Sequence, residues 1–355
     1  MSEIKENIQQ PAPLVTVRRG PIVESRHHGH IAIVDGDGRL IAELGAPETV
    51  TYLRSSAKPH QAIPLIVSGA ANAYGFTERE LAIVCASHNG ESIHTDTVAA
   101  MLCKIGLDAN ALRCGVHEPF SREVAQNLRA EGARPNILQN NCSGKHTGML
   151  ALAKFLNAPV ETYDQPDNPV QRKILHTIAQ FSATPVESIN IGIDGCGAPT
   201  FAISIRAMAT MYARLVAPPE DFDEHVRAAC ERIISAVTKY PEMIGGTSER
   251  LDTEVMRTCG HHLISKVGAE GVYTAGVRPS EMWPRGLGIA LKIEDGEDRR
   301  ARPTVAIETL RQLCVLDETA LQALAPYARF ALRNHRGDTV GEVRADFQLQ
   351  RTTCF

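Results

Sequence analysis

Patterns typical of β-hairpins stand near both ends of this 355-residue chain, and they constrain the fold more than any other feature. Strand-like residues flank the turn sequence DGDG at 35–38, a composition that hairpins favour, and a second pair flanks a similar turn at 334–338. A further pair precedes Asp295-Gly296. The three predicted pairs are 30–34 with 39–43, 271–275 with 288–293, and 329–333 with 339–343.

The middle of the chain is mostly helical by the periodicity of its apolar residues. The predicted helices are 95–107, 121–130, 145–156, 169–181, 202–213, 222–239 and 304–315. Strands at both ends with helices between them favour an α/β (α+β) fold, in which one antiparallel sheet is built from both termini and carries a helical lobe. We expect a single domain over residues 15–355, preceded by a flexible polar lead-in over residues 1–14.

Composition excludes several classes of protein. Hydrophobic residues make up 43% and charged residues 22%, which is typical of a globular chain, and the net charge of −4 comes without a basic cluster. Nucleic acid is therefore not an expected partner. The sequence has neither a signal peptide nor an apolar run long enough for a membrane span, and its nine cysteines form no CxxC pair. These features predict a cytoplasmic protein with reduced thiols.

A serine and a lysine stand three residues apart in Ser55-Ser56-Ala57-Lys58. On a helix, residues i and i+3 share a face, so Ser55 and Lys58 can touch. A neutral lysine in that place can take the serine proton. Pro59 is tolerated only near a helix start, so we expect the helix to begin close to Ser55, at its positive end.

Two further motifs follow in an order known from serine hydrolases. Ser87-His88-Asn89 is an S-x-N, and Lys266-Val267-Gly268 is a K-x-G placed just before a predicted strand. S-x-x-K, S-x-N and K-x-G, in this order, build the active sites of penicillin-binding proteins and serine β-lactamases. We expect Gly268 to leave room for substrate along the strand edge. Ser55 and Ser87 lie 32 positions apart, a spacing that is short for a β-lactamase and argues against antibiotic hydrolysis.

Two glycine-rich polar segments each carry a cysteine. Cys142 and Lys145 lie in NNCSGKHTG (140–148), and Cys196 lies in IGIDGCGAP (191–199). Two such cysteines could bind zinc together, although spacing alone favours two unrelated buried thiols. A polar run over 245–254, GGTSERLDTE, is either a loop that enters a helix or a segment that faces substrate.

Taken together, six motifs resemble the L-asparaginase II family of rhizobial, thermolabile type, over about residues 14–350. They are SSAKPHQ, CASHNGE, NNCSGKHTGML, DGCGAPT, GGTSERLDTE and ISKVGAEGVY. The resemblance implies a serine β-lactamase-like fold and a homodimer. It also implies that Ser55 is the nucleophile, that Lys58 is its partner, and that Ser87 and Lys266 complete two Ser–Lys pairs.

The resemblance further implies a zinc ion close to the active site, with Cys142, Lys145 and Cys196 as ligands, that assists substrate binding more than the chemistry. The implied reaction converts L-asparagine and water to L-aspartate and ammonia through a β-aspartyl ester. Asn89 and Thr247 belong to motifs expected to bind substrate. Charge assigns Arg54 to the substrate carboxylate and Asp194 to its ammonium group.

Other activities remain open at this point. The same machinery could serve a glutaminase, a β-aspartyl peptidase or a β-lactamase, because one methylene changes binding by only ~1–3 kcal/mol. A different possibility is a catalytically silent protein that binds zinc or an amino acid. The presence of Ser55, Lys58, Ser87 and Lys266 together speaks against that possibility.

Overall fold

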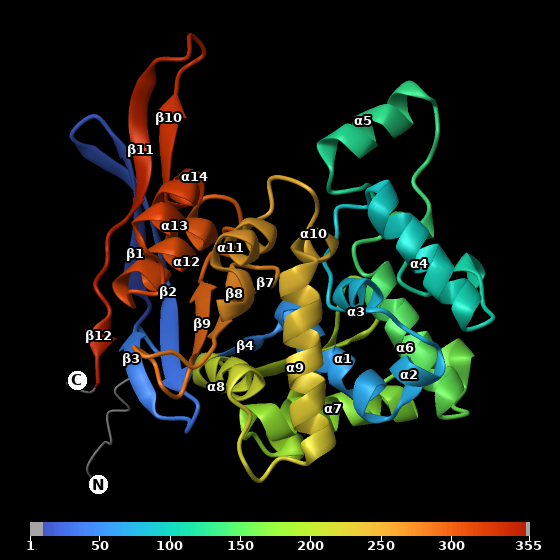
Figure 1. Ribbon diagram of the computed structural model, residues 1–355. Helices are drawn as coiled ribbons and strands as arrows, with labels where there is room; N and C mark the ends of the chain where they lie inside the picture. The colour runs from blue at the N-terminus through green and yellow to red at the C-terminus, as the bar shows by residue number, and fades with distance from the viewer. Residues whose placement is uncertain (1–9, 353–355) are drawn as a thin grey trace, which may run out of the picture.

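The computed structural model describes residues 10–352, and its largest element is an antiparallel sheet (Figure 1). The strands of this sheet are β1 (Ala12–Arg19), β2 (Ile22–Asp35), β3 (Leu40–Leu44), β7 (Leu263–Val267), β8 (Val272–Val277), β9 (Leu287–Ile293), β10 (Arg329–Arg333), β11 (Thr339–Ala345) and β12 (Gln350–Arg351). Within the described residues the order is β10-β11-β1-β2-β9-β8-β7, and β3 pairs with both β2 and β12.

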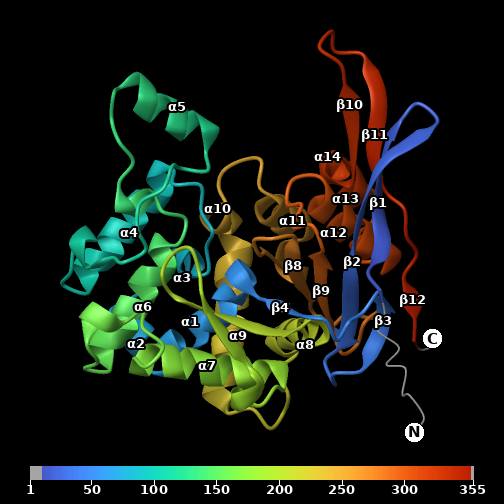
Figure 2. The same ribbon diagram turned by 180° about the vertical axis from the view of Figure 1, so that it is seen from behind.

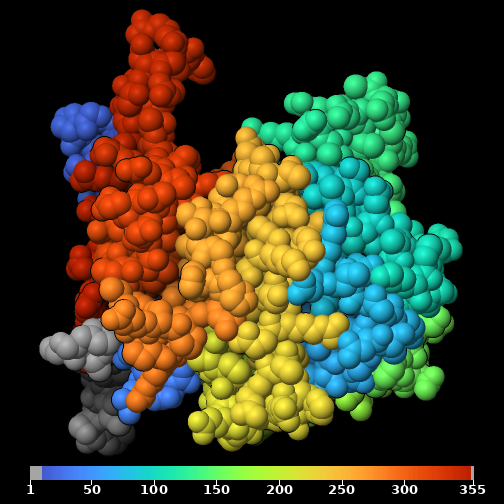
Figure 3. Space-filling view, viewed as in Figure 1, coloured from blue at the N-terminus to red at the C-terminus, as the bar shows by residue number. Residues whose placement is uncertain are grey.

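The two ends of the chain meet at the centre of this sheet. Val15 of β1 pairs with Ala345 of β11, and Ile31 of β2 pairs with Leu291 of β9. The three predicted hairpin pairs are present as β2–β3, β8–β9 and β10–β11. The prediction of one antiparallel sheet built from both termini is therefore confirmed. The β10–β11 hairpin extends well beyond the body of the molecule (Figure 3).

The structure differs from the sequence prediction at two segments. Residues 12–14, expected to belong to the lead-in, already form β1, because Leu14 is fully buried between neighbouring elements. The predicted helix over 202–213 begins as a strand, β6 (Pro199–Ser204), and becomes helix α8 (Ile205–Val216) only afterwards. β6 lies between β4 (Val50–Tyr52) and β5 (Asn190–Ile193) in a second, three-stranded sheet. Residues 1–9 of the lead-in lie outside the described residues.

Helices cover both faces of the large sheet. Along β2, Ile31 and Ile33 belong to the core on one face, while Ala32 and Val34 belong to the core on the other. This alternation follows from the two-residue period of a strand. The helices on the first face are α11 (Leu251–Cys259), α12 (Ala301–Gln312), α13 (Glu318–Ala323) and α14 (Ala325–Ala328). On the second face, α8 packs across β2, β8 and β9.

Two paired glycines allow α8 to approach the sheet closely. Gly276 of β8 pairs with Gly288 of β9. A Cβ at Gly288 would lie 1.9 Å from the Ala209 carbonyl oxygen, and a Cβ at Gly276 would lie 2.6 Å from a Val216 methyl group. Any larger side chain at either position would push α8 away from the sheet.

The remaining helices form a lobe beyond α8, which Figure 2 shows from behind. They are α1 (Lys58–Val67), α2 (Ala70–Ala73), α3 (Glu78–Val84), α4 (Ser92–Lys104), α5 (Arg122–Ala130), α6 (Ser143–Phe155), α7 (Pro169–Ser182), α9 (Glu224–Lys239) and α10 (Pro241–Ile244). None of the helices within residues 10–352 is long and apolar enough to cross a membrane. β7 is the edge strand nearest this lobe, so residues from β7 and from the lobe meet between the two parts.

Candidate active site

The S-x-x-K motif lies where β4 enters the helical lobe. A short 3₁₀ turn over Arg54–Ala57 leads directly into α1, which begins at Lys58. The predicted helix start near Ser55 is therefore correct within three residues. Ser55 is partly exposed, whereas the side chain of Lys58 is buried, with 1% of its surface accessible. A serine that meets solvent beside a buried amine has the exposure that a nucleophile needs.

Arg54, directly before Ser55, has a left-handed backbone with φ of +50°. This conformation costs a non-glycine residue about 1–3 kcal/mol and persists only where surrounding contacts hold it. The Arg54 guanidinium donates a hydrogen bond to the Asp194 carboxylate at 2.9 Å. The two residues predicted to bind substrate thus bind each other. Their ion pair holds Arg54 in this backbone conformation and so positions Ser55, the next residue.

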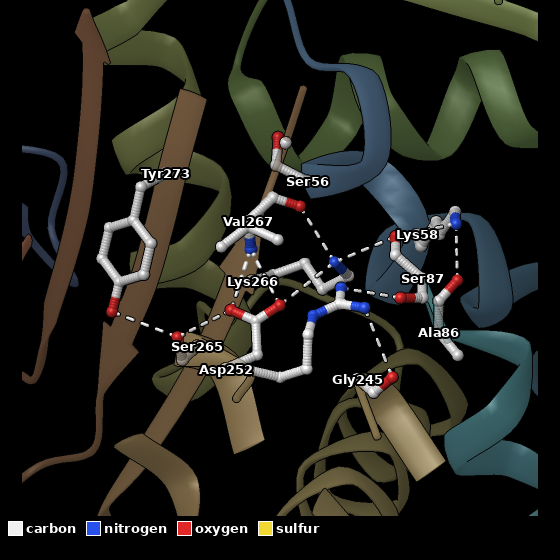
Figure 4. Close-up of polar contacts among 12 residues, drawn as sticks. Ser56, Lys58, Ala86, Ser87, Gly245, Asp252, Ser265, Lys266, Val267 and Tyr273 are labelled. Carbon is white, nitrogen blue, oxygen red and sulfur yellow. Dashed lines mark hydrogen bonds and ion pairs between the residues drawn. The ribbon is translucent and has the colours of Figure 1, made fainter. Parts of the chain in front are cut away.

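Ser87 lies between two buried lysines, as Figure 4 shows. Its hydroxyl oxygen is 2.9 Å from Lys58 Nζ and 3.3 Å from Lys266 Nζ. Lys58 Nζ also donates to the Ala86 carbonyl at 2.5 Å. Ser87 thus joins Lys58 to Lys266, while within the described residues the Ser55 hydroxyl has no hydrogen bond, to Lys58 or to any other group. The structure brings together residues from α1, the segment after α3 and β7 that are far apart in sequence.

Lys266 lies within β7, and its ammonium group faces Ser87 from the sheet side (Figure 4). Asp252 of α11 pairs with Lys266 Nζ at 3.3 Å, and both side chains are 1% accessible. Burial lowers the pKa of Lys266 to about 8, against the raising effect of Asp252, while Lys58 and Arg250 lower it further. A lysine with a pKa near neutrality can exchange protons under ordinary conditions.

The glycine of the K-x-G motif does not provide room for substrate, contrary to the sequence prediction. A Cβ at Gly268 would lie 2.9 Å from the Leu53 carbonyl oxygen and 2.9 Å from Val272 Cβ. The space beside Gly268 is therefore filled by the chain that leads into Arg54. This glycine instead lets the end of β7 pack against the segment that carries Ser55.

A second cluster holds the two predicted cysteine ligands and the lysine between them. Cys142 and Cys196 are free and buried, and the thiol of Cys142 is hydrogen-bonded to Cys196. That hydrogen bond and the charge of Lys145 lower the pKa of Cys196. Lys145 Nζ lies 3.1 Å from Cys196 Sγ. The three residues come from two segments that the family resemblance placed together and that spacing alone did not.

The donor chemistry of this cluster fits a zinc ion. Two sulfur ligands and one nitrogen ligand form a set that Zn²⁺ prefers. Beside them, His146 Nε2 is buried without a well-aligned hydrogen-bond partner, while Nδ1 bonds the Tyr163 hydroxyl at 2.7 Å. Within residues 10–352, no three His, Cys, Asp or Glu side chains converge as a metal site.

A protein-family model identifies the family of this chain. The model for L-asparaginase II matches residues 15–345, nearly the whole chain. The chain belongs to the L-asparaginase II family. This assignment agrees with the sequence resemblance and with the serine β-lactamase-like fold that the resemblance implies. None of the curated proteins compared with the chain matches it.

Distant solved structures resemble this L-asparaginase II family member. The glutaminase YbgJ of Bacillus subtilis, in covalent complex with 5-oxo-L-norleucine, is 13% identical with a TM-score of 0.39, and the match covers 87% of this chain and 93% of YbgJ. Native Mglu is 13% identical with a TM-score of 0.43, and the match covers 82% of this chain but only 66% of Mglu, just under two thirds. These likenesses do not establish the substrate of this chain.

Arg250 is a site residue that the motif analysis of this family member did not single out. Its guanidinium donates to the Ser87 carbonyl at 2.7 Å and to Asn89 Oδ1 at 2.6 Å, and it lies over the Phe120 ring. The Asn89 amide also donates to Glu91 at 3.1 Å. Asn89, predicted to bind substrate, therefore has both ends of its side chain engaged by the protein.

Thr247, also predicted to bind substrate, is exposed on the loop before α11. Its backbone N–H donates to the Glu91 carboxylate at 3.2 Å. Thr247, Arg250 and Asp252 all lie in the polar run 245–254. The density of polar residues there was the sequence signal for this part of the site, but it did not say which residues point inward.

Two stacked histidines, the first of which directly follows Ser87, support the segment that carries this serine. The rings of His88 and His94 lie 4.9 Å apart and nearly parallel. The backbone N–H of Gly90 donates to His88 Nδ1, and the backbone N–H of Glu91 donates to His94 Nδ1. Each ring nitrogen that accepts an N–H must be unprotonated. Burial lowers the pKa of both rings, so these contacts are made by neutral histidines.

Proposed function

We propose that this protein is an L-asparaginase, which hydrolyses the side-chain amide of L-asparagine through an acyl-enzyme. Membership of the L-asparaginase II family supports this substrate. The observation that carries the chemistry is the Ser87 hydroxyl between two buried lysine amines, one of them from Lys58, which follows the partly exposed Ser55 by three residues. Such an arrangement supplies a nucleophile, a proton acceptor and a positive charge in one place.

In the proposed acylation step, the Ser55 oxygen attacks the amide carbon of asparagine. Its proton passes to Lys58, and the leaving nitrogen takes a proton through Ser87, so that ammonia departs and a β-aspartyl ester remains. Water then cleaves the ester and releases aspartate. Backbone N–H groups near Ser55 are the expected donors to the oxyanion.

For substrate binding we propose Arg54 and Asp194, whose side chains are 27% and 13% accessible. The α-carboxylate of asparagine would bind the Arg54 guanidinium and its ammonium group would bind Asp194. Asn89 and Thr247 would act by shaping the loop that lines the site. The left-handed backbone at Arg54 links the binding of these charges to the position of Ser55.

We also propose that Cys142, Lys145 and Cys196 hold a zinc ion, which when bound would supply a fixed positive charge near the substrate. Lys145 must lose its proton to become a ligand. The proton transfers above use Ser55, Lys58, Ser87 and Lys266 only. A homodimer and a cytoplasmic location are further proposals, which rest on the resemblance and on composition.

Ammonia release from L-asparagine and from L-glutamine, by wild type and by Ser55→Ala, tests this function. We expect wild type to release ammonia faster from asparagine and Ser55→Ala to lose about 10⁴-fold or more of that rate. Faster turnover of glutamine would identify a glutaminase with the same chemistry. Equal activity of wild type and Ser55→Ala would show that Ser55 is not the nucleophile. Zinc binding without turnover of either amide would indicate the silent binding protein.

A further inference from the structure

The three acceptors around Lys266 match the three N–H groups of a protonated lysine. Its Nζ lies 2.9 Å from the Val267 carbonyl, 3.3 Å from Asp252 Oδ2 and 3.3 Å from the Ser87 hydroxyl (Figure 4). A carbonyl and a carboxylate can only accept hydrogen bonds. A neutral amine has two N–H groups and could donate to only two of these three oxygens.

Asp252 is held in place independently of Lys266. Its carboxylate accepts hydrogen bonds from the Ser265 hydroxyl at 2.9 Å and from the Val267 backbone N–H at 2.9 Å. The Ser265 hydroxyl also lies 3.1 Å from the Tyr273 hydroxyl. A neutral Lys266 would leave a buried carboxylate without its cation, which is a costly arrangement. The carboxylate is thus oriented to keep the amine protonated.

We propose that Asp252 is a positioning residue that holds Lys266 as an ammonium ion, which leaves Lys58 as the amine beside Ser87 that accepts a proton. This inference rests on the proposed function and assigns the roles of its two lysines. The two hydrogen bonds that Lys58 Nζ donates, to Ser87 and to the Ala86 carbonyl, match the two N–H groups of a neutral amine and leave its lone pair free. When Ser55 attacks, its O–H bond breaks and the proton forms a new N–H bond on Lys58.

The other titratable and charged groups that face Lys266 do not replace Asp252. Lys58 of α1 and Arg250 add positive charge and act to lower the pKa of Lys266. Burial raises the pKa of Cys85 to about 12 and also raises the pKa of Tyr273, so both stay neutral. Among the described residues, Asp252 is the one carboxylate bonded to Lys266. Removal of its charge should therefore allow Lys266 to become neutral.

The direct test is an NMR titration of the lysine ε-carbons in substrate-free protein, with the Lys266 signal assigned through Lys266→Arg. We expect an ammonium signal at pH 7 in wild type and a titration midpoint lowered by ~1–3 pH units in Asp252→Asn. Ser265→Ala is the matched control, since it removes a neutral partner of the same carboxylate. It should shift the midpoint by less than about half a unit. A neutral Lys266 at pH 7 in wild type would overturn the inference.

Substitution of each of the two lysines by arginine tests the same roles through the rate of ammonia release. This test does not need Asp252→Asn, so it stands even if that variant does not fold. Arginine keeps a positive charge and cannot accept a proton. Lys266→Arg should therefore retain at least about ten times more ammonia release than Lys58→Arg. The opposite order would refute the assignment. If no variant and not even wild type hydrolyses an amide, the proposed function fails, while the NMR result still decides the charge of Lys266.

Discussion

Two buried lysines, Lys266 and Lys145, show how differently one side chain behaves in two parts of the same site. Both are almost inaccessible to solvent, and burial acts to lower the pKa of each. Around Lys266 one carboxylate is opposed by two neighbouring cations, and the pKa falls to about 8. Around Lys145 the sulfurs of Cys196 and Cys142 outweigh burial, and the pKa is raised.

Burial alone therefore does not decide the direction in which the pKa of a lysine shifts. The charged groups around the lysine decide it. Lys266 contacts a hydroxyl and a carboxylate, so its ammonium group can place a positive charge beside Ser87. Lys145 instead contacts a sulfur, since its Nζ lies 3.1 Å from Cys196 Sγ. We therefore expect the serine–lysine cluster to govern turnover, and the cysteine–lysine cluster to govern metal content.

The largest expected effect comes from removal of the proton acceptor. Lys58→Met should lower kcat/KM for asparagine by about 10³-fold or more, because the nucleophile then lacks a base. Zinc content, measured by metal analysis of the purified protein, should stay the same as in wild type. Loss of zinc together with turnover would break the separation between the two clusters.

A substitution in the other cluster should have the converse effect. Cys196→Ser removes one of the two sulfurs and should weaken zinc binding by about 100-fold or more. We expect a higher KM for asparagine and a smaller change in kcat, in keeping with a metal that assists binding. Cys103→Ser, at an exposed free cysteine, is the control and should change neither quantity. A loss of kcat as large as that of Lys58→Met would contradict this comparison.

Arg250 sharpens the comparison because it is a partly buried cation whose direct contacts at Ser87 and Asn89 are neutral groups. Arg250→Met should lower the free energy of unfolding by about 2–4 kcal/mol, since the Ser87 carbonyl and Asn89 lose their donor. Arg250→Lys keeps the charge but cannot donate to both, so it should fall between Met and wild type. Urea unfolding of the three proteins measures this order, and a fully stable Arg250→Met would contradict it.

The smallest expected effect is a dependence of stability on pH, which comes from buried histidines that have no anionic partner in direct contact. Burial, and then the charge of His94, lower the pKa of His88 well below 6.5. Because the folded pKa is the lower one, the unfolded chain binds more protons as the pH falls below 6.5. Stability should then fall by up to ~1.4 kcal/mol per pH unit for this histidine, and be retained above pH 6.5.

Urea unfolding between pH 6.5 and pH 5 tests that dependence. His88→Asn should show a shallower loss of stability than wild type as the pH falls, since one of the buried histidines no longer titrates. His30, His60 and His146 also have lowered pKa values and will keep part of the slope. An unchanged slope in His88→Asn would mean that His88 is not held neutral in the folded protein.

The sequence was sufficient for the features that depend on neighbouring residues. Turn composition predicted the hairpins, and Pro59 predicted a helix start near Ser55. The contact between Ser55 and Lys58 that the i, i+3 spacing suggests stays a prediction. Family resemblance, rather than spacing, joined Cys142 to Cys196. The sequence did not predict roles for Asp252 and Arg250. Their roles depend on hydrogen bonds to Lys266 and Ser87, and only the folded chain brings these residues together. The charge of Lys145 likewise depends on a sulfur 51 positions away.

The pairing of Val15 with Ala345 has a consequence for synthesis on the ribosome. Strands β1 and β2 are made first, but β11 and β9, the strands that pair with them in the sheet, are made last. At 5–20 residues per second, the apolar faces of the first strands wait for their partners for ~15–60 s. Pairings that distant also slow folding after release. Lys266 arrives late as well, so we expect activity to emerge only with the nearly complete chain, and folding yield to depend on chaperones that shield the N-terminal strands.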